Sequence, residues 1–263
     1  MRISNLAKVV LGVISSAVMA AVYIPLFIVL INSFNSSMNM DWPPPGFTMD
    51  WWQKAFGSAG LAAALSTSVV VALCASLIAV ILGTLLAMAL SRYNFFGKNS
   101  VSLMVILPIA LPGIVTGLAL NNAFRTVLGM QLSMATVIIA HATFCIVTVY
   151  NNVLARLSRV NRNLEDASAD LGAGVFTTFR LVTLPQIGSA LVAGALLAFA
   201  LSFDEIIVTT FTAGSGVETL PIWIMNNMFR PGKAPVVDVV AVTTVLISVV
   251  PLYFANRLTR EGK

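Results

Sequence analysis

Six apolar runs, separated by polar segments, dominate the pattern along the chain. Each is about 20 residues long or longer, the length that an α-helix needs to cross the hydrocarbon core of a bilayer. Lipid offers no partner to an unpaired backbone amide, so each run is expected to be helical. The predicted spans are approximately residues 9–31, 61–90, 101–120, 133–154, 188–211 and 236–255. The pattern predicts an all-α, six-span membrane protein in which residues 1–263 form a single transmembrane domain.

Composition agrees with this interpretation. The chain is 58% hydrophobic and only 10% charged, whereas a soluble domain is typically about 25% charged. The first apolar run is longer than the core of a secretory signal and lacks a small-residue cleavage site before the Pro-rich stretch that follows. We therefore expect this run to be retained as a membrane span.

The distribution of Lys and Arg predicts the orientation. If the N-terminus is cytoplasmic, the outer loops hold four of the 15 basic residues, and the cytoplasmic segments hold the other 11. This bias favours an N-in, C-in topology. The sequence pI of about 9.6 then reflects topology and contact with anionic lipid, since no nucleic-acid-binding motif is present. The four outer residues are Lys54, Arg125, Arg230 and Lys233.

On this topology, residues 155–187 form a cytoplasmic loop that contains the stretch "LEDASADLGAGVFTTFRLVTLPQI". Acidic residues near the start of this stretch suit the first turn of a helix. Asp166 and Asp170 are four residues apart and would share a helix face. Gly172 permits a tight turn or the close approach of another backbone. Pro185 lacks a backbone donor and marks the start of the next span.

This stretch resembles the cytoplasmic loop of ABC-importer permeases, whose pattern is Glu-Ala-Ala, three residues, Gly, and later a hydrophobic-x-Leu-Pro ending. Two positions depart from the pattern, Asp for Glu and Ser for the second Ala, and they keep the charge sign and the small size. The resemblance implies a coupling helix that docks in a groove of an ATP-hydrolysing subunit; the alternative is a solvated connector with helical caps. The implied coupling residues are Asp166, Ala167, Ser168, Asp170, Leu171, Gly172, Leu184 and Pro185.

The likeness extends over nearly the whole chain, including the stretch "SFDEIIVTTFTAG". The chain is similar to the spermidine/putrescine-type permeases, and among them it is more similar to the second, smaller permease of the pair. The resemblance implies the type I ABC-importer permease fold in a bacterial inner membrane. It also implies a heterodimer with another permease, two ATP-binding subunits and an extracytoplasmic substrate-binding protein.

No Gly-rich, Lys-Ser/Thr phosphate loop is present, so ATP should be bound by a partner subunit and not by this chain. The sequence also shows no nucleophile–base set and no metal-ligand cluster. We therefore expect a transport subunit without enzymatic activity, cofactor or metal of its own.

Two prolines interrupt the third predicted span. Pro108 and Pro112 each remove a helical hydrogen bond, so the helix should kink or break there. Gly113 and Gly117 form a pair of small residues that lets another helix approach closely. The span could lie beside the translocation path, or the kink could serve ordinary packing.

The fifth predicted span carries two carboxylates, Asp204 and Glu205. Carboxylates in hydrocarbon are costly and should face a cavity or a partner. On a helix, adjacent residues point about 100° apart, so the two are not expected to share one cavity. They could serve a cationic substrate, or they could bond to a neighbouring helix. In the following outer loop, Trp223 and Asn226 could reach the path, an expectation based on position alone.

Three further residues fall inside predicted spans. His141 is a functional-site candidate because it is ionisable, and the alternative is a neutral imidazole bonded to a neighbouring helix. Cys74 and Cys145 lie in strongly apolar segments, so a structural apolar role is expected for both.

The sequence thus predicts the permease subunit of an ATP-driven importer, with polyamines as the preferred substrate class. Alternatives within the importer class are another small organic cation, an opine-like compound or ferric iron. A stand-alone secondary transporter is a different possibility, against which the coupling-type loop argues.

Overall fold

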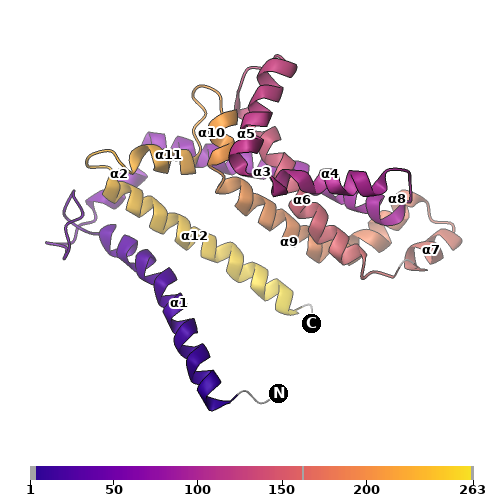
Figure 1. Ribbon diagram of the computed structural model, residues 1–263, viewed down its shortest axis with the longest axis horizontal. Coiled ribbons are helices and arrows are strands. Elements are labelled where there is room, and N and C mark those ends of the chain that lie inside the picture. The colour runs from indigo at the N-terminus through magenta and orange to yellow at the C-terminus, as the bar shows by residue number, and fades with distance from the viewer. Residues whose placement is uncertain (1–3, 162, 262–263) are drawn as a thin grey trace. The chain divides into compact units, whose positions relative to one another are not determined.

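The computed structural model describes residues 4–161 and 163–261, with side chains up to residue 247, and the described residues are mainly helical (Figure 1). A single isolated bridge, Asn35 to Phe47, is the β-type pairing within them. The predicted all-α fold is confirmed. The helices are α1 (Asn5–Asn32), α2 (Asp50–Phe56), α3 (Ala59–Arg92), α4 (Lys98–Ala110), α5 (Gly113–Asn122), α6 (Met134–Leu157), α7 (Asn163–Asp170), α8 (Val175–Thr178), α9 (Leu184–Phe203), α10 (Ile207–Thr212), α11 (Leu220–Asn227) and α12 (Ala234–Glu261), with π-helical turns η1 (Ala123–Val127) and η2 (Phe179–Thr183).

Four described helical segments are long and apolar enough to cross a membrane: Asn5–Asn32, Ala59–Arg92, Met134–Leu157 and Val175–Phe203. The pair α4 and α5 makes a fifth if it is counted as one broken span. Helix α12 coincides with the sixth predicted span. The part of α12 for which side chains are described, Ala234–Ile247, is shorter than a membrane-crossing helix. The sixth span therefore stays a prediction.

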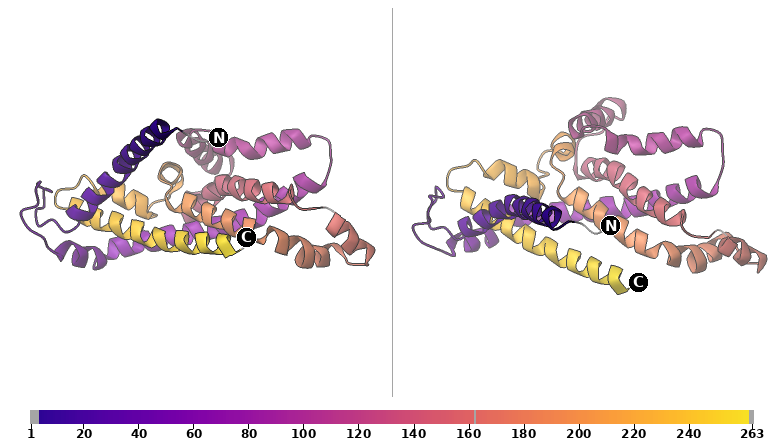
Figure 2. Two further views of the ribbon diagram at one scale, coloured as in Figure 1. Left: turned by 90° about the horizontal axis from the view of Figure 1, so that it is seen from below. Right: turned by 60° about the horizontal axis from the view of Figure 1, so that its bottom comes forward.

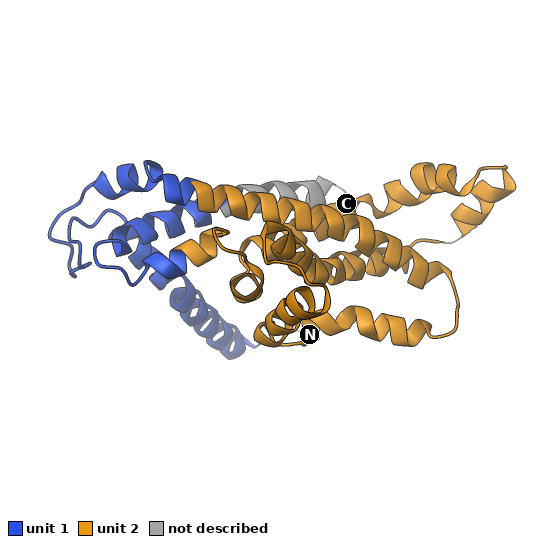
Figure 3. Cartoon of the chain, turned by 90° about the horizontal axis from the view of Figure 1, so that it is seen from above, with its two compact units in different colours: residues 1–62, 224–263 blue, residues 63–223 orange. Residues whose placement is uncertain are grey.

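The chain divides into two compact units, one made of Met1–Ala62 and Ile224–Lys263 and the other of Ala63–Trp223 (Figure 3). Whether they act as one transmembrane domain stays a prediction. In the first unit, α2 packs against α12, and α1 also contacts α12. The segment after α1 folds around Asn35, whose backbone oxygen accepts a 2.8 Å hydrogen bond from the indole N–H of Trp51. Helix α1 buries none of its residues.

The core of the second unit is built from α3, α6 and α9, and α6 and α9 pack along each other (Figure 2). The buried face of α3 is lined mainly by small side chains. Such residues let helix backbones approach closely in lipid, where apolar burial alone gives no preference for protein over hydrocarbon. The buried positions from residue 63 onward are Ala64, Ser68, Val71, Ala72, Ala75, Ser76, Ala79, Gly83, Thr84, Ala87 and Leu90.

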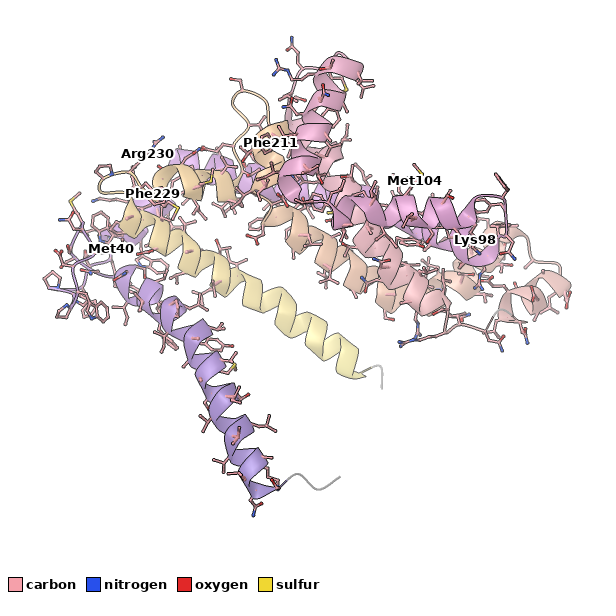
Figure 4. All side chains as sticks on the ribbon, in the orientation of Figure 1. Met40, Lys98, Met104, Phe211, Phe229 and Arg230 are labelled. Carbon is pink, nitrogen blue, oxygen red and sulfur yellow. The ribbon has the colours of Figure 1, made fainter. Side chains whose placement is uncertain are left out.

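The third predicted span is broken as expected. The chain bends by 109° between Lys98–Ala110 and Gly113–Val127; Pro108 lies inside α4, and Pro112 is the N-cap of α5. A Cβ on Gly117 would lie 2.7 Å from the ring of Phe211, so the absence of a side chain at residue 117 lets α5 pack against α10. Figure 4 labels Phe211 at this contact.

The fifth predicted span is not one continuous helix. Helix α9 ends at Phe203, and α10 begins at Ile207. The carboxylate of Glu205 accepts a hydrogen bond from the backbone N–H of Val208, 2.9 Å away, in the first turn of α10. Asp204 and Glu205 therefore lie in a helix break, and the expectation of two residues 100° apart on one helix was wrong.

The close approach of α3 to α6 at Gly83 gives a stability prediction. A Cβ on Gly83 would lie 2.9 Å from the carbonyl oxygen of Ile146 and 3.1 Å from the amide of Tyr150, so α3 or α6 would have to move. We expect Gly83→Ala to destabilise the solubilised protein by about 1–3 kcal/mol, as overpacking does.

The control is Gly188→Ala in α9, where an added Cβ meets nothing within 4 Å. Thermal unfolding in detergent, followed by the loss of monodisperse protein, compares the two variants. Equal unfolding temperatures would show that the α3–α6 contact does not limit stability.

Candidate functional site

The predicted coupling loop folds into a short helix, a tight turn and a second short helix. Helix α7 ends in a Schellman turn, in which the N–H of Ala173 bonds to the oxygen of Ser168 and the N–H of Gly172 bonds to the oxygen of Ala169. Gly172 adopts a φ of +83°, and a Cβ there would meet nothing within 4 Å. Of the two roles expected for Gly172, the structure shows the tight turn, and among the described residues it shows no close approach to this position.

This segment forms an exposed knob, defined here as residues 163–178. It extends away from the ends of α6 and α9 in each view (Figures 1 and 2). Helix α7 buries none of its residues, and Asp166 and Asp170 are exposed. The tip adds three highly exposed apolar side chains, so the knob presents carboxylates beside exposed apolar surface. These are Leu171 (89% exposed), Val175 (87%) and Phe176 (76%).

The remaining predicted coupling residues lie inside or beneath the knob. The hydroxyl of Ser168 lies 3.0 Å from that of Thr178 and joins α7 to α8. Leu184 and Pro185 begin α9, where proline is tolerated because the first helical amides need no intrahelical acceptor. The Nε of Arg156, near the end of α6, donates to the carbonyl oxygen of Gln186 at 2.8 Å. The knob is therefore continuous with the paired helices α6 and α9.

Sequence reasoning missed an ion pair at the base of the knob. An oxygen of Glu165 lies 2.7 Å from Nη2 of Arg92 at the end of α3, and it also accepts a 2.8 Å hydrogen bond from the hydroxyl of Thr183. The acidic first turn of α7 was the available signal, but the sequence did not indicate its partners.

A second polar cluster lies around the break between α9 and α10. The imidazole of His141, which is fully buried, lies 2.8 Å from the hydroxyl of Ser202 through Nδ1 and 2.9 Å from that of Thr209 through Nε2. The hydroxyl of Thr209 also donates to the backbone oxygen of Glu205 at 2.8 Å. Helix α6 is thereby tied to both sides of the break. Of the two roles expected for His141, the structure shows an imidazole bonded to neighbouring helices.

The two predicted carboxylates have different surroundings. Asp204 ends α9 and is exposed, whereas Glu205 is half-buried and holds the start of α10. Glu205 therefore fits the structural role, and Asp204 is the exposed carboxylate at the break.

The other predicted path residues are placed separately. Pro108 and Pro112 flank the α4–α5 bend. In α11, Trp223 is buried and Asn226 is exposed. The start of α11 is fixed on α3 by a 2.7 Å hydrogen bond from the N–H of Leu220 to the hydroxyl of Ser68.

Within the described part of the chain, no group of three His, Cys, Asp or Glu side chains could hold a metal ion. Cys74 and Cys145 are free thiols.

Residues 79–261 match the family described as the binding-protein-dependent transport system inner membrane component. The chain belongs to this family. Its members are transport permeases, not enzymes, so the knob and the helix break belong to a multi-pass membrane transport subunit.

Curated relatives of this permease extend over most of its length. It is 34% identical to the spermidine/putrescine transport system permease protein PotC of Escherichia coli, over 97% of this chain and 96% of the relative. It is also 34% identical to the putrescine transport system permease protein PotI of Escherichia coli, over 83% of this chain and 79% of that one.

Solved structures support the same fold. A bacterial ABC transporter involved in the import of the acidic polysaccharide alginate matches 99% of both chains with a TM-score of 0.73 and 13% identity. The MetNI methionine ABC transporter matches 78% of this chain and 94% of its own, with a TM-score of 0.59 and 19% identity. The predicted ABC-importer permease fold is confirmed.

The positive φ of Gly172 gives a prediction for the knob. A leucine in this left-handed conformation costs roughly 1–2 kcal/mol, so Gly172→Leu should distort the turn that ends α7. We expect normal membrane insertion, with uptake and stimulated ATP hydrolysis falling together in the assembled transporter.

Two variants serve as controls. Gly172→Asn should retain more activity because asparagine tolerates this conformation, and Gly174→Ala should be near wild type because Gly174 is extended and unobstructed. Wild-type uptake by a well-expressed Gly172→Leu variant would contradict a coupling role for this turn.

Proposed function

We propose that this chain is the membrane-spanning permease subunit of an ATP-driven importer of polyamines such as spermidine and putrescine. The observation that carries the proposal is the near-complete alignment with the polyamine permease PotC. The proposal is further supported by the knob, because a stand-alone secondary transporter needs no surface for docking an ATPase.

The proposed assembly contains a second permease as heterodimer partner, two ATP-binding subunits and an extracytoplasmic binding protein. ATP is bound and hydrolysed by the ATP-binding subunits, and this chain carries no cofactor. The exposed carboxylates and apolar tip of the knob form the surface that meets one ATP-binding subunit.

The proposed orientation places both termini in the cytoplasm. The excess of Lys and Arg in the segments assigned to that side supports it. This orientation puts the knob on the cytoplasmic side, where the ATP-binding subunits are expected. The location is the bacterial inner membrane, in contact with anionic lipid.

The proposed substrate is a cation with several ammonium groups. A path through the membrane must replace part of its hydration with acceptors, and a carboxylate is worth more there than in water. Asp204 is the proposed acceptor, because it is exposed at the helix break, whereas Glu205 is engaged by α10. Pro108, Pro112, Trp223 and Asn226 are secondary candidates for the path.

A different substrate remains the second candidate. The putative 2-aminoethylphosphonate transport system permease protein PhnV of Salmonella paratyphi A is 29% identical over 96% of this chain. A permease of similar sequence is therefore named for an amino compound that also carries a phosphonate group, and this compound is the second candidate substrate. Competition between labelled spermidine and 2-aminoethylphosphonate during uptake separates the two candidates.

The orientation can be tested with single cysteines in a background that lacks Cys74 and Cys145. Positions 171 and 47 are well exposed, at 89% and 73%, so an impermeant maleimide should reach them. We expect position 171 to be labelled only from the cytoplasmic side and position 47 only from outside. The reverse pattern would overturn the proposed orientation and the location of the knob.

The substrate path can be tested at the helix break. If Asp204 faces the substrate, Asp204→Asn should lower spermidine uptake per assembled complex about tenfold, the effect of removing one charge-assisted contact, without changing basal ATP hydrolysis. Glu205→Ala removes the acceptor for the Val208 amide. The loss should destabilise the protein by about 1 kcal/mol and thereby lower the amount of assembled complex.

Uptake normalised to complex, measured beside thermal stability in detergent, distinguishes these two roles. Unchanged normalised uptake by Asp204→Asn would remove Asp204 from the path and weaken the assignment to polyamines.

A further inference from the structure

One carboxylate at the base of the knob joins three elements that lie far apart in sequence. Oε1 of Glu165, in the first turn of α7, lies 2.7 Å from Nη2 of Arg92 and 2.8 Å from the hydroxyl of Thr183. Arg92 ends α3, and Thr183 immediately precedes α9. A single oxygen therefore accepts hydrogen bonds from the ends of two membrane helices.

Apolar packing does not fix this end of α7. The helix buries none of its residues, and even Leu164 is 51% exposed. The side-chain contact between Ser168 and Thr178 remains within the knob. Asn161 caps the first amides of α7 locally, and Glu165 makes the side-chain contacts that tie the start of α7 to α3 and to Thr183.

These contacts are sheltered enough to be strong. The side chain of Arg92 is 12% exposed and that of Glu165 is 18% exposed. A charge-assisted hydrogen bond in such surroundings is stronger than a bond between neutral groups and is screened less than a surface ion pair. Loss of the carboxylate would leave the guanidinium of Arg92 without this partner in a largely enclosed position.

The two donors lead directly into the helical core. Leu90, two residues before Arg92, and Ile187, four residues after Thr183, both belong to the buried cluster that packs α3, α6 and α9 together. Displacement of Glu165 would therefore act on the ends of two helices that share this buried cluster.

We propose that Glu165 is a positioning residue that transmits displacement of the knob to α3 and α9. The proposal rests on the proposed function and specifies where force enters the spans. Glu165 does not dock the ATP-binding subunit in this mechanism, because the exposed docking surface lies at Asp166, Asp170 and the apolar tip. Its carboxylate carries that subunit's movement to the helix ends.

The test uses the complete transporter in liposomes, with both permeases, the ATP-binding subunits and the binding protein, and labelled spermidine as the probe. Spermidine uptake, ATP hydrolysis and the amount of ATP-binding subunit retained are measured on the same samples. Glu165→Ala should retain the subunit and hydrolyse ATP, but its uptake per ATP should fall by about tenfold, the factor expected for losing one charge-assisted hydrogen bond.

A charge exchange separates transmission from general stabilisation. The double variant Arg92→Glu with Glu165→Arg should recover most of the uptake per ATP that each single substitution loses, since a threonine hydroxyl can accept as well as donate. Glu165→Gln keeps the shape without the charge and provides a second variant should Glu165→Ala fail to fold; its uptake per ATP should also fall.

Lys98→Gln is the matched control. Lys98, labelled in Figure 4, begins α4, and its ammonium group lies 3.2 Å from Oδ1 of Asn94. It should keep wild-type uptake per ATP. Unchanged uptake per ATP in Glu165→Ala or Glu165→Gln, or no recovery in the charge exchange, would overturn the role of Glu165. Absence of ATP-dependent spermidine uptake in the wild type would instead overturn the proposed function, and this inference with it.

Discussion

A helix that breaks within an apolar segment must find partners for the backbone groups that the break releases. Hydrocarbon supplies none, so each partner has to come from the protein or from enclosed water. The break between α9 and α10 shows how this chain meets that requirement. Glu205 accepts from the Val208 amide, and the hydroxyl of Thr209 donates to the carbonyl oxygen of Glu205. A helix break is tolerated here because the polar side chains of Glu205 and Thr209 bond to its backbone groups.

Close packing of the helices is the second requirement, and it fixes the positions of the polar side chains relative to one another. The core of the second unit depends on small residues. Gly83 lies against the backbone of α6, and a Cβ added to Gly194 would lie 3.3 Å from the Cα of Val149. Backbones at such distances leave little freedom for sliding. Rigid pairs of helices can therefore present His141, Ser202 and Thr209 to one another in fixed positions, and can carry displacement from one end to the other.

The sequence predicted those features that depend on local pattern. Long apolar runs predicted the main helices, Pro108 and Pro112 predicted the break between α4 and α5, and Gly172 predicted the turn that ends α7. The break at Asp204 was not predicted, because the flanking sequence remains apolar and a continuous span accounts equally well for its hydropathy. The pair of Arg92 and Glu165 joins residues 73 positions apart, and neither hydropathy nor local spacing encodes such a contact.

Helix α9 runs from the polar cluster at the base of the knob to the polar cluster at the break. Its first residues follow Thr183, which bonds to Glu165 of the knob, and its last turn contains Ser202, which bonds to His141 beside the break. Twenty residues of α-helix separate these ends by about 30 Å, and α6 supports α9 along that length. In the proposed transmission, a load on the first turn of α9 translates or tilts its last turn, where the chain is already interrupted. The break therefore provides a place for such motion to be absorbed or to alter the exposure of Asp204, without unfolding the helix that carries it.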